Sequence, residues 1–465
     1  MDDSRNGATD AAPPDAVDDA AAAALGRAWL ADDSWDLLTR LTELDDRLGG
    51  HPGDRRAAEL VAGALGDAGV RNVREEPFDV NRWTRGRTEL AVSVPERDVE
   101  RSFEAVALPY SPAYEGEAPL VDVGYGTPQE LDEADVAGAV AVTRTATPPD
   151  FGRPYHRAEK VGHAAAAGAE AFVFTNHVPG QLPPTGSLRF NREAAIPGLG
   201  VSKETGDWLR EYAAEGARTH VRVDAETEPA TSRNVVGVVG PSSQGEAGEV
   251  VVLAHFDAHD VGEGALDNGC GIATAVGMAR ILAATDLDRR VRIAGVSCEE
   301  LGLVGSEALA ADLALGDVHA VVNVDGAGRY RELNALVHAS DAMAELASDV
   351  ADAVGHPVSV QERPHPYSDH WPFLREGVPT LQLHSKAPDA EGTWDRGWTH
   401  TRADTRDKAD RRNLREHAML AALLVREIAA TDLPRLDTAV VCEQLEAYGA
   451  DEGMRAADIW PDGWE

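Results

Sequence analysis

The chain has 465 residues, of which 80 are acidic and 43 are basic, so its formal net charge is −37 at pH 7. This acidic excess argues against a nucleic-acid partner or an anionic membrane, since both are bound through basic patches. The acidic residues are spread along the chain, a pattern typical of halophilic proteomes, in which acidic surfaces keep proteins hydrated in concentrated salt. An acidic enzyme from a mesophile is the alternative interpretation.

The chain contains only three cysteines, Cys270, Cys298 and Cys442. A small, odd number of cysteines does not predict a disulfide framework and fits a reducing cytosol. The amino-terminal residues lack a basic region followed by an apolar core, so we expect no signal peptide. No apolar stretch is long enough to span a bilayer. Together these observations predict a cytoplasmic protein.

The first fifth of the chain predicts an arm, two helices and two strands. Residues 1–19 are rich in Asp, Ala and Pro, and we expect them to form a disordered acidic arm. Apolar residues at helical spacing between residues 20 and 68 predict two helices, which the glycines and proline of residues 48–53 separate. Residues 70–78 and 82–94 then predict strands, the second of which leads out of this domain.

The composition changes again at residues 95–231, where glycines, prolines and short Val/Ala runs predict a separate small β-rich domain. After it, short β-branched runs at 250–254, 291–296 and 318–324 predict buried strands, with helices between them. Alternating strands and helices are typical of a layered α/β domain with helices on both faces of its sheet. We therefore expect a discontinuous α/β domain (20–94 and 232–431), an inserted domain (95–231) and a C-terminal tail (432–465).

Polar residues stand where the predicted strands end. His255-Phe256-Asp257 follows the first strand, Glu299-Glu300 the second, and Asp325 the third. Ligands of open α/β sheets bind at the carboxyl ends of the strands, so we expect these side chains to meet. Two metals about 3.5–4 Å apart need one bridging carboxylate, two further ligands each and a general base. The sequence offers six such residues, namely His255, Asp267, Glu299, Glu300, Asp325 and His400.

Histidines together with carboxylates suit zinc, or a similar divalent ion, better than calcium or magnesium. Some of these residues have a second interpretation. Asp267 could cap the helix that follows it, and Asp325 could form a turn with the next glycine. His370 and His384 compete with His400, and the sequence does not choose among the three.

Other metal-binding or nucleophilic residue types have weaker patterns. His259 follows His255 by four residues, as in the helix of zinc proteases, but Phe256 stands where that motif needs Glu. The preceding strand also places His259 on a loop, so we do not expect it to bind metal. The remaining residues that we do not expect to act in the site are His156, His163 and His177, which lack acidic companions, and Cys270 and Cys298, which lack a basic neighbour.

These motifs resemble those of the co-catalytic zinc aminopeptidases, which are related to glutamate carboxypeptidase II, the transferrin receptor and glutaminyl cyclase. The matching segments occur in the family's order at residues 47–54, 255–257, 267–271, 299–300, 325, 368–373, 400–401 and 404–405. Cys270 departs from the family, in which serine is usual, but it is not a ligand position. The resemblance implies a three-layer αβα domain with a mixed central sheet, interrupted by a β-rich protease-associated domain.

The resemblance also implies a role for each candidate residue. Two Zn²⁺ ions, or other divalent ions such as Co²⁺ or Mn²⁺, would be held by His255 and Asp325, by Glu300 and His400, and by Asp267 as the bridge. Asp257 would orient His255. Glu299 would be the general base, which takes a proton from the attacking water and passes it to the leaving amine. The substrate would be a peptide, and the inserted domain would cover the cleft or take part in a homodimer.

Three functions are compatible with these motifs. The first is a metal-dependent exopeptidase, most readily an aminopeptidase, although a carboxypeptidase of the same family is an alternative. The second is a glutaminyl-cyclase-like acyltransferase, which residues 369–379 resemble, but those enzymes use one zinc and have no protease-associated insertion. The third is a non-catalytic binding protein like the transferrin receptor, for which we would expect ligands to be missing, and none is missing here.

Overall fold

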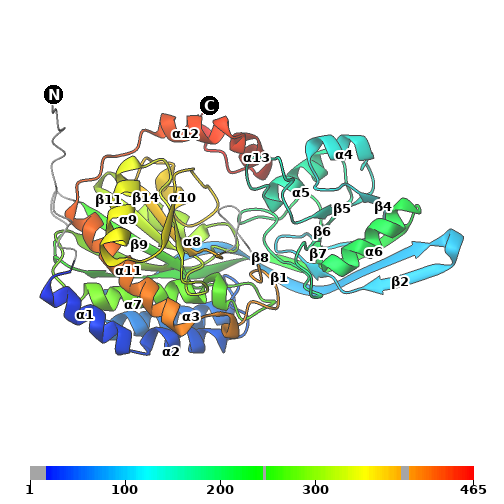
Figure 1. Cartoon of the computed structure of the whole chain (residues 1–465). Coiled ribbons are helices and arrows are strands. Elements are labelled where there is room, and N and C mark those ends of the chain that lie inside the picture. Colours follow the sequence, from blue (N-terminus) through cyan, green and yellow to red (C-terminus); the bar gives the residue numbers. More distant parts are fainter. Residues whose placement is uncertain (1–16, 244–247, 389–396, 465) are drawn as a thin grey trace, which may run out of the picture.

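The computed structural model describes residues 17–243, 248–388 and 397–464 (Figure 1), so most of the predicted acidic arm lies outside the described residues. A mixed sheet forms the centre of the α/β domain. Its parallel strands lie in the order β14 (Thr380–Ser385), β11 (Val318–Val324), β9 (Glu249–His255) and β10 (Arg290–Val296). Antiparallel neighbours flank them, namely β8 (Arg218–Val239) beside β10 and β12 (Leu333–Leu336) beside β14, with β13 (Val358–Gln361) at the edge.

Helices cover both faces of this sheet, which confirms the predicted three-layer αβα domain. Along β9, Val250, Val252 and Ala254 pack into the core on one face, whereas Val251 and Leu253 pack into the core on the other. Strands that are buried on both faces have continuous apolar runs, and these runs made the strands visible in the sequence. The first core is closed by α1 (Asp19–Leu30), α2 (Asp33–Thr42), α3 (Pro52–Asp67), α7 (Cys270–Leu282), α9 (Asp341–Val354) and α11 (Arg411–Ala430), and the second by α8 (Val304–Asp312) and α10 (Trp371–Leu374).

The inserted domain extends the main sheet, because its strand β4 (Tyr114–Asp122) pairs antiparallel with β8. Its parallel strands are β4, β5 (Val140–Arg144), β6 (Ala171–Thr175) and β7 (Gly198–Val201), and β3 (Val106–Ala107) pairs antiparallel with β7. The helices of this domain are α4 (Pro128–Ala134), α5 (Arg157–Ala166) and α6 (Lys203–Ala214). The β-rich insertion that the sequence predicts is therefore present, and helices accompany its strands (Figure 1).

Two long strands run from one domain into the other (Figure 1). Strand β1 (Arg71–Val94) pairs antiparallel with β8 from Arg71 opposite Val238 to Ser93 opposite Arg218. The prediction of separate strands at 70–78 and 82–94 is wrong, because the chain continues through residues 79–81 as one strand. Beyond it, β2 (Val99–Phe103) turns back along β1. The two domains are thus joined by one long antiparallel ladder, whose register shifts between Arg71 and Arg74 and between Arg85 and Thr88, and not by a pair of loops.

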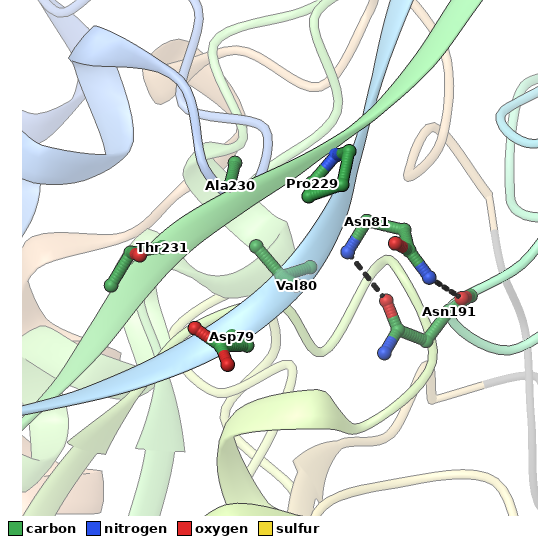
Figure 2. A pocket seen from close by; sticks show the side chains of 7 residues that line it. All are labelled: Asp79, Val80, Asn81, Asn191, Pro229, Ala230 and Thr231. Atoms are coloured by element: carbon green, nitrogen blue, oxygen red, sulfur yellow. Dashed lines mark hydrogen bonds between the residues drawn. The ribbon is translucent and has the colours of Figure 1, made fainter.

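A loop of the inserted domain is fastened to β1 beside a hollow between β1 and β8 (Figure 2). The backbone N–H of Asn81 donates to Asn191 Oδ1 at 2.8 Å, and the Asn81 side-chain amide donates to the Asn191 carbonyl at 2.7 Å. The same loop approaches the backbone of Gly302, where a Cβ atom would lie 2.5 Å from the Cα of Phe190. Gly302 has φ +107°, so both its conformation and its neighbour require glycine.

The C-terminal tail forms two further helices, α12 (Thr438–Ala447) and α13 (Ala450–Ala457), which lie across both domains (Figure 1). Val441, Leu445 and Met454 pack in one cluster with Leu303 and Trp371 of the α/β domain. On its other side α13 contacts α5 of the inserted domain. Within the parts of the chain that the structure describes, no helix is both long and apolar enough to cross a bilayer.

Candidate active site

The carboxyl ends of β9, β10 and β11 lie side by side, because these strands are parallel neighbours in the sheet. His255 is the last residue of β9, and Asp325 directly follows β11. Glu299 and Glu300 stand in the turn after β10. The polar residues that the sequence places at strand ends therefore meet at one edge of the sheet, as predicted.

The first group of candidate ligands forms around His255, which is completely buried. Its Nε2 lies 3.3 Å from Asp267 Oδ1 and 3.7 Å from Asp325 Oδ1. Its other ring nitrogen, Nδ1, lies 3.3 Å from Asp257 Oδ1. The backbone N–H groups of Glu299 and Glu300 each donate to the Asp257 carboxylate at 3.2 Å. Asp257 thus fixes the imidazole and the following acidic pair at the same time.

The second group forms around His400 and shares Asp267 with the first. His400 Nε2 lies 3.2 Å from Asp267 Oδ2 and 3.2 Å from Glu300 Oε2. Asp267 therefore turns one oxygen toward each histidine, which is the arrangement of a bridging carboxylate. A residue that the sequence analysis set aside also lies here, since His259 Nε2 is 2.7 Å from Glu300 Oε2.

The structure also decides which of the three competing histidines joins the group. His370 donates from Nε2 to the His365 carbonyl at 2.7 Å, and His384 Nε2 accepts from the Asn334 amide at 3.3 Å. Within residues 17–243, 248–388 and 397–464, neither belongs to a set of side chains that could hold a metal ion. His400 does, together with Glu300, in agreement with what the family resemblance of residues 400–401 and 404–405 implies.

A further layer of hydrogen bonds orients the carboxylates. Asp404 accepts from the backbone N–H of Leu266 at 2.7 Å and from that of Asp267 at 3.2 Å, which holds the segment that carries the shared carboxylate. Ser368 donates its hydroxyl to Asp325 Oδ2 at 2.8 Å. Such partners fix the direction in which a ligand atom points, and the loss of one typically weakens metal binding about 10- to 100-fold.

The surroundings of Glu299 and Glu300 shift the pKa values of these two adjacent residues in opposite directions. Burial raises the pKa of Glu299 well above its ordinary value, and the charges of Glu300 and Asp325 raise it further, although His255 opposes them. Burial also acts to raise the pKa of Glu300, but His259 and His400 outweigh it and hold that pKa well below the ordinary value. Carboxyl groups with pKa values driven apart in this way are suited to different tasks, one to proton transfer and the other to binding as an anion.

The residues of both groups fit divalent cations. Carboxylates outnumber the histidines, and uncompensated buried carboxylates are costly unless cations accompany them. Nε2 of His255 is buried without a hydrogen-bond partner among the described residues. The Nε2 atoms of His255 and His400 lie 3.2–3.7 Å from the carboxylate oxygens around them. Two ligand atoms on one tetrahedral zinc are about 3.4 Å apart, given bond lengths near 2.1 Å.

The inserted domain contributes directly to this site. The backbone N–H of Thr185 donates to the His400 carbonyl at 2.8 Å, and His400 Nδ1 lies 3.3 Å from the Thr185 carbonyl. Ser187 donates its hydroxyl to the Glu300 carbonyl at 2.5 Å, and its own carbonyl accepts from Arg157 Nε at 2.8 Å. Sequence analysis missed these residues, because contacts through main-chain carbonyls leave no pattern in the sequence.

Comparison with known proteins agrees with this geometry. Residues 234–425 match the model of peptidase family M28, and residues 116–209 match that of the PA domain. The chain belongs to peptidase family M28. This M28 peptidase is 26% identical to Aminopeptidase YwaD from Bacillus subtilis over 405 residues, and this alignment covers 85% of the chain and 84% of that protein. It is 29% identical to Leucine aminopeptidase 2 from Trichophyton equinum over 266 residues, 56% of the chain and 50% of that protein.

Solved structures share the fold of this M28 peptidase. A peptidase M28 precursor from Shewanella amazonensis superimposes with a TM-score of 0.73 at 23% identity, over 90% of the chain and 98% of that protein. A zinc aminopeptidase from Bacillus subtilis superimposes with a TM-score of 0.67 at 24% identity, over 86% of the chain and 97% of that protein. The overlap extends through both domains, so the inserted PA domain is part of the shared architecture.

Proposed function

We propose that this M28 peptidase is a two-zinc aminopeptidase, which hydrolyses the first peptide bond of substrates with a free amino terminus. The observation that carries the proposal is the shared carboxylate of Asp267, whose two oxygens face His255 and His400 at 3.3 and 3.2 Å. The name of the Bacillus subtilis relative, an aminopeptidase aligned over 85% of the chain, supports the choice of substrate end.

Five residues would hold the two cations, namely His255, Asp267 and Asp325 at one position and Asp267, Glu300 and His400 at the other. When bound, the cations polarise the scissile carbonyl and lower the pKa of the attacking water toward about 7. Zinc is supported by the donor types, and Co²⁺ or Mn²⁺ would be accepted by the same side chains.

Glu299 would move the proton in this reaction. Its backbone N–H is held by Asp257, so its carboxyl group is positioned beside the ligands without being one of them. Its environment raises its pKa, so it readily accepts a proton from water and can then deliver it to the leaving amine. Asp257 would orient these groups, since it accepts hydrogen bonds from both glutamate N–H groups while it faces His255.

A panel of four substrates tests the proposal. Leucine para-nitroanilide, a free dipeptide, an amino-blocked dipeptide and a glutamine-initiated peptide are incubated with the full chain in molar KCl, with and without a chelator. We expect chelator-sensitive hydrolysis of the three substrates that have a free amino terminus, while the amino-blocked dipeptide stays intact. Hydrolysis of the blocked dipeptide would show a carboxypeptidase instead, cyclisation with ammonia release would show a glutaminyl cyclase, and no turnover would show a binding protein.

We further propose that the protein works in a salt-rich cytosol. The net charge of −37 and the three cysteines, all of which are free thiols, support this setting. The same charge disfavours nucleic acids and anionic membranes as partners. A homodimer stays a prediction, and sedimentation of the purified chain in molar KCl would test it.

A further inference from the structure

His259 lies at the second group of ligands in a position that hydrogen bonding does not explain. It is 6% exposed and follows β9 on the loop, so its spacing from His255 is not that of two histidines on one turn of a helix. Its Nε2 lies 2.7 Å from Glu300 Oε2, and its ring meets that of His400 edge-on with 4.5 Å between centroids. Both of these neighbours belong to the candidate metal site.

Neither ring nitrogen of His259 has a hydrogen-bond partner among the described residues. The short distance to Glu300 therefore lacks the direction that a hydrogen bond needs. A buried imidazole that makes no directed hydrogen bond is costly, and native structures seldom keep one without a reason. His255 shows the same condition at its Nε2, which points toward Asp267 and Asp325. The two histidines thus present a buried, unpartnered nitrogen to carboxylate oxygens in the same way.

The donor atoms of His259, Glu300 and His400 all lie within 4.8 Å of one another. With the oxygen that Asp267 turns toward His400, this position has four protein donors, two of them imidazole nitrogens. The position at His255 has only three, of which one is an imidazole. Four protein ligands complete the coordination of a tetrahedral zinc, whereas three leave a place open for water or substrate.

We propose that His259 is a third terminal ligand at the metal position of Glu300 and His400. The position that includes His259 then holds its cation more tightly, and the position at His255 keeps the open place that a substrate carbonyl needs. This inference rests on the proposed two-metal function. With the five expected ligands alone, the two metal positions would have nearly equivalent ligand sets, whereas His259 makes them different.

Metal titration of the full chain tests the proposal without relying on turnover. Metal-free protein is titrated with Co²⁺ in molar KCl, and both calorimetry and the visible spectrum of bound Co²⁺ are recorded for four proteins. These are the wild type, His259→Phe, His259→Gln and the control His417→Gln, which removes a buried imidazole on α11. Melting of each metal-free protein shows that the variants are folded.

We expect two binding steps in the wild type and in the control. In His259→Phe and His259→Gln, the tighter step should weaken by more than about 10-fold, since even outer partners of ligands are worth about 10- to 100-fold. The Co²⁺ spectrum of that step should also change, while the weaker step stays as it is. His259→Asp, which restores a donor atom, should recover part of the lost affinity.

Two results would overturn the proposal. In one, His259→Phe binds both cations within about threefold of the wild type. In the other, His259→Gln keeps full affinity for both cations. Glutamine can still donate a hydrogen bond to Glu300 but is a poor zinc ligand, so this result would mean that His259 only supports the Glu300 carboxylate. A wild-type chain that binds fewer than two cations would instead refute the proposed function, before any variant is compared. If His259→Phe does not fold, the Gln and Asp variants decide.

Discussion

The substitution Asp257→Asn should disable the site while leaving its shape almost unchanged. Three N–H groups gather around Asp257. The backbone N–H groups of Glu299 and Glu300 donate to its Oδ1 and Oδ2, and Nδ1 of His255 lies 3.3 Å from Oδ1 and 3.3 Å from the Asp257 backbone carbonyl. Asparagine keeps one acceptor oxygen and replaces the other with an NH₂ group. At least one of the three donors would then face another donor.

The magnitude follows from the hydrogen bond that is lost. Asp257 is completely buried, so no water replaces the missing acceptor. A hydrogen bond to a charged group contributes about 1.5–3 kcal/mol. Because about 1.4 kcal/mol corresponds to a factor of ten, we expect metal affinity at the His255 position to fall about 10- to 150-fold. The rate should fall as well, since the same carboxylate holds the backbone of Glu299, the proposed general base.

Calorimetric titration with Zn²⁺ and hydrolysis of leucine para-nitroanilide measure the two effects. Asp207→Asn is the control, because Asp207 lies on α6 of the inserted domain and pairs with Lys203 of the same helix at 3.4 Å. The control should keep both the affinity and the rate. If Asp257→Asn binds two zinc ions within about threefold of the wild type, the role of Asp257 in orienting His255 is refuted.

Three further predictions address the proposed general base, the loss of stability at acidic pH and the negative charge of the chain. Glu299→Ala should lower kcat by about 10²- to 10⁴-fold while two cations per chain remain bound, and a kcat near the wild-type value would remove Glu299 from the proposed role. Burial lowers the pKa of His417 to about 4, and the neutral ring accepts from Gly328 N–H while it donates to the Arg331 carbonyl. As the pH falls, the unfolded chain therefore takes up a proton at this histidine before the folded chain does. The free energy of unfolding does not depend on this group above pH 6.5, and it decreases by about 3 kcal/mol as the pH drops toward 4. His417→Gln, which keeps both hydrogen bonds, should reduce that pH dependence of the urea midpoint, and an unchanged slope would contradict the assignment. Finally, the melting temperature should be higher in molar KCl than in dilute KCl. The electrostatic screening length shrinks from about 10 Å at 0.1 M to about 3 Å at 1 M, which weakens the repulsion among the acidic residues. Equal melting temperatures would count against a halophilic protein.

The strands that carry the site could be predicted because they are buried on both faces. Residues 318–324 were predicted as a strand and form β11 with the same bounds, and 250–254 and 291–296 lie within β9 and β10. Because both faces of these strands are buried, few polar residues interrupt their apolar runs. Strand β1 was divided in two for the opposite reason, since it is partly exposed along much of its length and has many charged residues. Its pairing with β8 joins residues more than a hundred positions apart, and no local pattern reports such a partner.

The ligand set was only partly visible from the sequence. His255, Glu300 and Asp325 stand next to strand ends, so sheet geometry alone brings them together. His400 does not, and before the structure only the family resemblance, and not its spacing, separated it from His370 and His384. His259 was set aside because its spacing failed to match a helical motif. That argument excluded one way of binding a metal, but a loop can bring the same side chain to the same place.

The inserted domain takes part in the candidate site and does not merely cover it. Ser187 holds the carbonyl of Glu300 and Thr185 holds both the carbonyl and the ring of His400, so two candidate ligands of one proposed metal position take their orientation from another domain. That domain is itself fixed by the β1–β8 ladder, by the Asn81–Asn191 pair and by α13 against α5. A displacement of about 1 Å at catalytic groups can cost about 100-fold in rate. The long shared strands and the C-terminal helices therefore have a functional reason, because they keep Ser187 and Thr185 in register with the ligands that they orient.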